Sequence, residues 1–143
     1  MNDDQRLNYK YFSRITTRWM DNDIYGHINN VVYYSYFDSV TNKYLIEEGG
    51  LDIQNADIIG FVVASTCQYK SPVSYPEPLT AGLRVNKLGN SSVEYGIGIF
   101  KEGAEQASAM GTFTHVFVDR TTDKSVPIPS ELRVALEALA IKE

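Results

Sequence analysis

Residues 18–30 read Arg-Trp-Met-Asp-Asn-Asp-Ile-Tyr-Gly-His-Ile-Asn-Asn, and no other part of the chain is so dense in reactive groups. Two acidic residues, a glycine, a histidine and a pair of asparagines stand directly before a long helical pattern. The first N–H groups of a helix have no partner inside it, and the helix dipole is positive at that end. Such a helix start suits an anion or a polarised carbonyl. The sequence therefore brings groups capable of proton chemistry to a helix N-terminus.

A long helix is expected from about residue 30 to residue 48. Its apolar stripe has helical spacing and comprises Tyr33, Tyr36, Phe37, Val40 and Tyr44. Asn29 or Asn30 can cap the start of this helix, and Gly49-Gly50 supplies its end. Because most of the stripe is aromatic, we expect the helix to be deeply buried.

Strands account for most of the remaining chain. Alternation of apolar and polar residues predicts them over residues 9–18, 60–70, 79–88, 93–100 and 107–118. A short helix capped by Ser130 is expected over residues 130–141. The order of one strand, a long helix, four consecutive strands and a short helix indicates an α+β fold. In it, a meandering antiparallel sheet wraps one buried helix.

Length and composition narrow the class of protein. A chain of 143 residues fits a single domain over residues 1–143. The net charge of −5 argues against a nucleic-acid partner, which would favour a basic surface. The single cysteine, Cys67, rules out an internal disulfide, and no apolar run has the length of a membrane span. A cytoplasmic location and no membrane partner are therefore expected.

Metal sites and the common nucleophile motifs are not indicated. Asp21 begins a stretch like a calcium loop, but Tyr25 and Val32 occupy positions where that loop needs oxygen ligands. The two histidines, His27 and His115, have no nearby cysteine or histidine to complete a zinc site. No Gly-x-Ser-x-Gly motif is present. We expect neither a metal nor another cofactor, and we expect His115 to be a core residue.

Within the opening stretch, the two aspartates are given different roles. Asp21 is expected to be structural, as aspartates in turns commonly are. Asp23 lies a few residues before the helix start, where its neighbours Ile24, Tyr25 and Ile28 would partly desolvate it and raise its basicity. It is therefore the candidate catalytic residue.

The role of His27 stays open at this point. Its imidazole is suited to general base catalysis. Alternatively, the side chain only hydrogen-bonds within the loop and holds its shape. The residue types alone do not distinguish these two roles.

The motif R-W-x-D-x-D-x-x-G-H-I-N-N-x-x-Y-x-x-Y-F over residues 18–37 resembles the hotdog-fold acyl-CoA thioesterases, in the 4-hydroxybenzoyl-CoA thioesterase-like branch. Shorter similar segments follow in the expected order at residues 69–79, 111–119 and 126–129. The resemblance implies a hotdog fold with a five-stranded antiparallel sheet around the long helix. It also implies a homodimer or homotetramer with active sites between subunits.

The resemblance further implies an acyl-CoA thioesterase that releases a free carboxylic acid and CoA. The catalytic carboxylate of the family is the second acid of Asp-x-Asp, here Asp23, acting as base or nucleophile. Backbone N–H groups around Asn29 and Asn30 would hold the thioester oxygen. The residues expected to contact the substrate are Tyr25, His27, Asn29, Asn30 and Tyr33.

The CoA phosphates are harder to place. Aryl-specific relatives hold them with a basic pair near one strand turn, where this chain has only Lys87. The candidates for this contact are therefore Lys70, Lys87 and Arg120. CoA is favoured over an acyl carrier protein, because such a carrier is acidic and so is this chain.

Two alternatives to a thioesterase are a non-catalytic module that binds acyl-CoA and, more weakly, a dehydratase of hydroxyacyl thioesters. A dehydratase needs a histidine facing a helix-borne acid. Asp38 is the only acid well inside the long helix before Glu47, and His27 precedes that helix.

Overall fold

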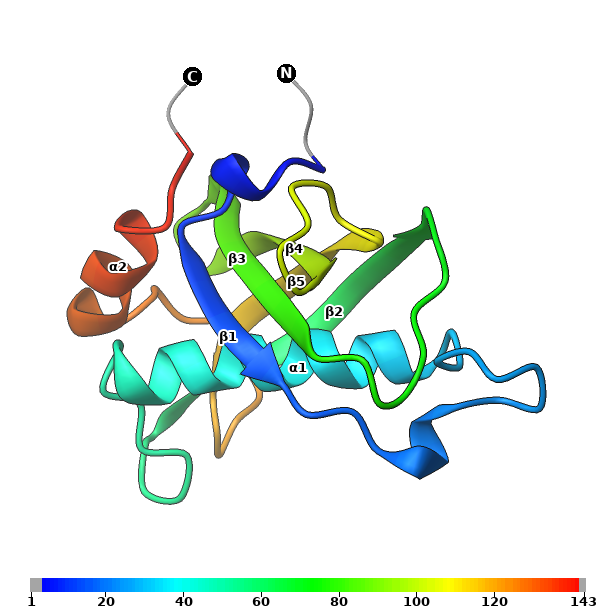
Figure 1. Cartoon of the computed structure of the whole chain (residues 1–143). Coiled ribbons are helices and arrows are strands. Elements are labelled where there is room, and N and C mark those ends of the chain that lie inside the picture. The colour runs from blue at the N-terminus through cyan, green and yellow to red at the C-terminus, as the bar shows by residue number, and fades with distance from the viewer. Residues whose placement is uncertain (1–3, 142–143) are drawn as a thin grey trace.

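Five antiparallel strands form one sheet that curves over a long helix, as Figure 1 shows for the computed structural model, which describes residues 4–141. The strands are β1 (Tyr11–Ile15), β2 (Ile58–Tyr69), β3 (Leu79–Leu88), β4 (Ser92–Lys101) and β5 (Ala109–Asp119). The helices are α1 (Val32–Glu47) and α2 (Ser130–Glu137), with short 3₁₀ turns at Arg6–Asn8 and Trp19–Asp21. The α+β hotdog architecture expected from the sequence is confirmed.

The strand order is β1-β3-β4-β5-β2. Strands β3, β4 and β5 are joined by hairpins, and their apolar residues pair across the inner face, as Leu83 does with Ile97. The expected meander is wrong for β2, which lies beside β5 rather than beside β3. The connection over residues 70–78 contains three prolines and is too long for a tight hairpin. Within residues 4–141, β2 therefore pairs on one side only and is an edge strand of the sheet.

Helix α1 is buried against the sheet, as its aromatic stripe predicts. Phe37 and Leu45 are fully buried, and Tyr33 is 3% exposed. Tyr44 donates its hydroxyl to the carbonyl of Ala135, which ties α1 to α2. Gly50 has φ of +71° and follows the helix, and the N–H of Leu51 reaches back to the carbonyl of Leu45. The predicted glycine stop is therefore confirmed.

Several element boundaries differ from expectation, and the differences at β1, α1 and α2 have clear structural reasons. Strand β1 ends at Ile15 because its neighbour β3 begins at Leu79, directly opposite. Helix α1 begins at Val32, and its N-cap, Val31, makes no side-chain capping bond, so neither asparagine is the N-cap. Helix α2 ends at Glu137 because the following chain pairs with β3.

No helix within residues 4–141 is long and apolar enough to cross a membrane.

Candidate active site

The loop that carries Asp23 is closed by its own hydrogen bonds. Asp23 Oδ1 accepts the backbone N–H of Tyr25 at 2.8 Å and that of His27 at 3.3 Å. The N–H of Asp23 donates to the carbonyl of His27 at 2.7 Å. Gly26 has φ of +81°, a conformation that favours glycine. The sequence therefore folds here into a tight turn with the Asp23 carboxylate at its base.

Asp21 anchors this loop to the body of the protein. Its side chain is buried and accepts hydrogen bonds from the backbone N–H and guanidinium of Arg18, and from Tyr36 Oη at 2.8 Å. Burial by itself would raise the pKa of Asp21, but the bonds from Tyr36 and Arg18 outweigh it and lower the pKa. The structural role predicted for Asp21 is confirmed.

A cavity of about 440 Å³ lies where the start of α1 meets the end of β2. Predicted site residues that line it are Asp23, His27, Asn30, Tyr33 and Lys70. The lining of this cavity thus combines the Asp23 carboxylate, the start of α1 and the Lys70 side chain, which come from separate parts of the chain.

Two predicted substrate contacts, Tyr25 and Asn29, do not line this cavity. Tyr25 is 78% exposed, and Ile24 is 92% exposed. Within one chain, these two side chains therefore do not desolvate Asp23, contrary to expectation, whereas Ile28 is buried as expected. The reason is that the turn at Gly26 directs the loop tip into solvent.

The two asparagines before α1 also differ. Asn29 donates its N–H to the carbonyl of Asp21 at 2.8 Å, and its Oδ1 accepts the N–H of Val31 at 3.1 Å. Its carbonyl accepts the N–H of Val32 at 2.9 Å. Within residues 4–141, the N–H of Asn30 has no acceptor. Asn29 therefore stabilises the turn, and the backbone N–H of Asn30 remains available as a donor to a ligand in the cavity.

Two tyrosines contribute to the lining of the cavity. Tyr33 and Tyr69 pack edge to face, with ring centroids 5.1 Å apart. Burial raises the pKa of Tyr33 to about 12, so its phenol stays protonated at neutral pH. Beside them, burial raises the pKa of the Cys67 thiol, which argues against a thiolate nucleophile. Tyr69 was not among the predicted contacts, although it opens the similar segment at residues 69–79.

Of the three candidate phosphate contacts, only Lys70 lines the cavity. Lys87 lies near the turn between β3 and β4, and strands β4 and β5 separate β3 from β2 in the sheet. The guanidinium of Arg120 donates to the carbonyls of Ile53 and Gln54 and holds the loop after α1 in place.

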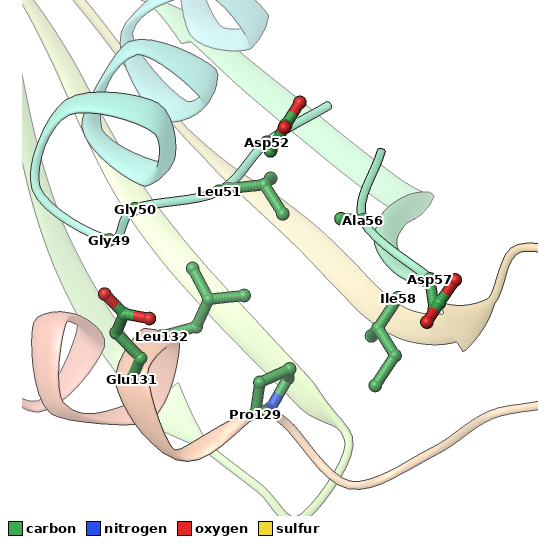
Figure 2. Close-up of a pocket in the computed structure, with 10 residues that line it drawn as sticks. All are labelled: Gly49, Gly50, Leu51, Asp52, Ala56, Asp57, Ile58, Pro129, Glu131 and Leu132. Carbon is green, nitrogen blue, oxygen red and sulfur yellow. The ribbon is translucent and has the colours of Figure 1, made fainter. Parts of the chain in front are cut away.

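That loop borders a second hollow of about 330 Å³, at the C-terminal end of α1 (Figure 2). Its floor contains Leu51, Ile58 and Leu132, and the carboxylates of Asp52, Asp57 and Glu131 are at its rim. Among the described residues that line it there is no lysine or arginine, so this lining does not suit phosphates.

His115 is a core residue, as predicted. It is 2% exposed, and its Nδ1 lies 3.3 Å from Tyr95 Oη. Burial lowers its pKa to about 4, so the imidazole is neutral at pH 7. It does not line the cavity that contains Asp23.

A model of the thioesterase-like superfamily matches residues 17–136, a span that contains the Asp23 loop, α1 and the whole cavity. The chain belongs to the thioesterase-like superfamily. The resemblance drawn from residues 18–37 is thereby confirmed, and with it the expected enzyme class, a thioester hydrolase.

This thioesterase is similar to several known proteins. It is 55% identical to the PA5185 protein of Pseudomonas aeruginosa strain PAO1, whose crystal structure matches it with a TM-score of 0.95 over 96% of each chain. It is 28% identical over 130 residues to the long-chain acyl-CoA thioesterase FadM of Escherichia coli strain K12, covering 89% of this chain and 97% of FadM. A shorter match, 25% identical over 88 residues, covers 62% of this chain and 59% of the uncharacterized protein YsmA of Bacillus subtilis strain 168.

Proposed function

We propose that this thioesterase hydrolyses acyl-CoA to a free carboxylic acid and CoA, with Asp23 as its catalytic carboxylate. The observation that carries the proposal is that Asp23 and Asn30 line one cavity at the start of α1. A base or nucleophile thus faces a backbone N–H that can hold a carbonyl oxygen. The similarity to FadM, a long-chain acyl-CoA thioesterase, supports CoA as the carrier.

The reaction needs few groups, because a thioester carbonyl is already electrophilic. Asp23 removes a proton from water as the water oxygen adds to the carbonyl carbon, or its carboxylate adds directly. The negative charge that forms on the carbonyl oxygen is held by the N–H of Asn30 and the positive end of α1. The C–S bond then breaks, and the sulfur leaves as the CoA thiol after taking up a proton. If water is the nucleophile, this step also yields the free acid. If the Asp23 carboxylate is the nucleophile, it yields an acyl anhydride on Asp23, and water then hydrolyses this anhydride to release the free acid and restore the carboxylate.

The loop geometry suits this role for Asp23. Two N–H groups hold Oδ1, while Oδ2 has no donor within residues 4–141. One oxygen is therefore fixed, and the other is available to water or substrate. His27 lines the same cavity and is proposed as a substrate contact, together with Tyr33.

For the CoA phosphates, we propose Lys70. It is exposed and lies at the mouth of the cavity, directly after β2. An ammonium there attracts phosphate oxygens as they reach the protein surface. Lys70 follows the end of β2, whereas Arg120 follows the end of β5, which pairs with the start of β2. Lys87 is near the end of β3, at the same end of the sheet as Arg120. Within one chain, Lys87 and Arg120 therefore lie at the end of the sheet opposite Lys70.

We further propose a homodimer, or a tetramer built from it, with the active site between subunits. Strand β2 leaves one edge unpaired, and Phe61, Val62 and Val63 on it are exposed. An open apolar edge strand favours pairing with another strand. A second copy would also cover the exposed side chains Ile24 and Tyr25 beside Asp23. The low cysteine content fits a cytoplasmic enzyme.

The alternatives receive less support. A dehydratase would need a histidine opposite an acid on α1, but Asp38 is exposed and bonds to Asn42 on its own helix. A non-catalytic acyl-CoA-binding module would not need the Asp23 carboxylate in the cavity.

The test is release of free thiol from a panel of acyl-CoAs that includes long-chain, short-chain and aromatic acyl groups. Asp23→Asn keeps an oxygen for the two loop N–H groups but loses the charge, so kcat should fall about a hundredfold or more. Asp38→Asn is the matched control and should keep full activity. Undiminished hydrolysis by Asp23→Asn would remove Asp23 from the mechanism. Tight binding of an acyl-CoA without thiol release would favour the binding module.

A further inference from the structure

Tyr69 joins the end of strand β2 to the turn that precedes helix α1. Its hydroxyl donates to the backbone carbonyl of Asn30 at 3.0 Å, and its ring packs edge to face against Tyr33. We infer that Tyr69 is a positioning residue that fixes the backbone of Asn30, so that the N–H of Asn30 faces the thioester oxygen. The inference rests on the proposed function.

The hydrogen bonds around Asn30 show what Tyr69 adds. The peptide group before Asn30 is held because the carbonyl of Asn29 accepts the N–H of Val32. The peptide group after Asn30 is held at its N–H by Asn29 Oδ1 and at its carbonyl by Tyr69. Within residues 4–141, no other side chain donates to that carbonyl. Within residues 4–141, the bond from Tyr69 is therefore the only hydrogen bond that links the peptide group after Asn30 to the sheet.

A fixed donor matters because an N–H that already points at the developing charge needs no reorganisation during the reaction. The two walls of the cavity come from parts of the chain that are distant in sequence, the start of α1 and the end of β2. Tyr69 bridges these walls, so it also sets their separation. A displacement of about 1 Å in such a site can cost about a hundredfold in rate.

Tyr69 is suited to a clean test because it is 48% exposed and its hydroxyl is not part of the core. Tyr69→Phe keeps the ring against Tyr33 and removes the hydroxyl, and with it the bond to Asn30 and the contact with the Cys67 thiol. Tyr34→Phe is the matched control, since it makes the same chemical change on the first turn of α1. Tyr34 packs on Phe37 and does not line the cavity.

For every acyl-CoA that the wild type hydrolyses, Tyr69→Phe should lower kcat about tenfold and change KM less than about twofold. Tyr34→Phe should match the wild type in both constants. A rise in KM with kcat unchanged would make Tyr69 a substrate contact and overturn the inference. Unchanged constants would overturn it as well.

A second measurement needs no substrate and separates this inference from the proposed function. Hydrogen exchange of the Val31 and Val32 amides reports on the turn, because both donate to Asn29. Tyr69→Phe should speed their exchange at least about threefold, with the amides in the middle of α1 unchanged. Faster exchange would support the positioning role of the Tyr69–Asn30 bond even if the protein hydrolysed no acyl-CoA. A lack of hydrolysis would reject only the proposed function. Unchanged exchange overturns the inference.

Discussion

Asp21 and Asp23 are two positions apart and have different surroundings. The Asp21 side chain is 1% exposed and both of its oxygens accept hydrogen bonds. In Asp23, Oδ1 accepts hydrogen bonds within the turn, and the residue also lines a cavity. Only Asp23 therefore has space for a reactant, and Asp21 holds the loop that presents it.

Removal of the Asp21 carboxylate should cost stability. In Asp21→Ala, the hydroxyl of Tyr36 and the backbone N–H of Arg18 lose their acceptor. An unsatisfied buried polar group costs about 1–3 kcal/mol, so the free energy of unfolding in urea should fall by about 2 kcal/mol. Asp38→Ala changes an exposed acid on α1 and should shift it by less than about 0.5 kcal/mol. Equal effects of the two substitutions would contradict the anchoring role.

The open question of His27 can be decided by substitution. The hydrogen bonds that shape its turn use its backbone, so His27→Gln should leave the loop intact. As a substrate contact, His27 should change KM and lower kcat less than about fivefold, whereas loss of a general base costs about a hundredfold or more. The measurement is steady-state hydrolysis across pH. A hundredfold fall in kcat would make His27 the base.

At the scale of elements, α1 and the sheet approach one another closely at Gly111. A side-chain carbon at this position of β5 would meet the ring of Phe37 on α1 at 2.7 Å and the backbone carbonyl of Thr66 on β2 at 2.0 Å. Neither neighbour can move away easily, since Phe37 is fully buried and Thr66 belongs to the paired strand β2. Glycine is therefore needed for the helix to sit in the curve of the sheet.

Gly111→Ala should lower the free energy of unfolding by about 2 kcal/mol or more, because overpacking a core forces neighbours to shift. Thr114→Ala, on the same strand, is the control and should cost less than about 1 kcal/mol. Both values come from chemical denaturation. Wild-type stability in Gly111→Ala would contradict a close contact between β5 and α1.

At the scale of the whole molecule, His115 makes stability depend on pH. Its pKa is about 4 in the folded protein and 6.5 in an ordinary environment. As pH falls below 6.5, the unfolded chain takes up this proton first, so the contribution is fully present above pH 6.5 and lost toward pH 4. The loss should approach about 3 kcal/mol.

Denaturation of the wild type and His115→Gln between pH 7 and pH 4 tests this directly. The glutamine keeps a polar partner for Tyr95 and cannot titrate. The difference in unfolding free energy between the two proteins should shrink as pH falls. The lowered pKa of Asp21 affects stability below its ordinary value of 3.8, outside this pH range, and to the same extent in both proteins. A difference that stays constant with pH would contradict the buried neutral histidine.

Assembly belongs to the same scale. If β2 pairs with a second copy, Phe61→Asp combined with Val63→Asp places charges on the open edge and should convert an oligomer to a monomer in sedimentation experiments. Hydrolysis should fall with it, because the proposed active site lies between subunits. An oligomer unaffected by these charges would place the interface elsewhere.

Features that depend on local pattern could be predicted from the sequence. The long helix followed from the spacing of its aromatic stripe, the strands from alternation and turn residues, and the family from the motif over residues 18–37. The different roles expected for Asp21 and Asp23 also rested on local features, namely the distance from the helix start and the position within the motif.

Features that depend on long-range contacts became visible in the folded chain. The order of strands placed β2 beside β5, and this brought Tyr69 and Lys70 to the cavity that contains Asp23. The bonds of Asn29 to Asp21 and Val31 left Asn30 as the available donor. The physical reason is that helix and strand periodicity is written in neighbouring residues, whereas a hydrogen-bond partner or a cavity wall depends on which distant segments pack together.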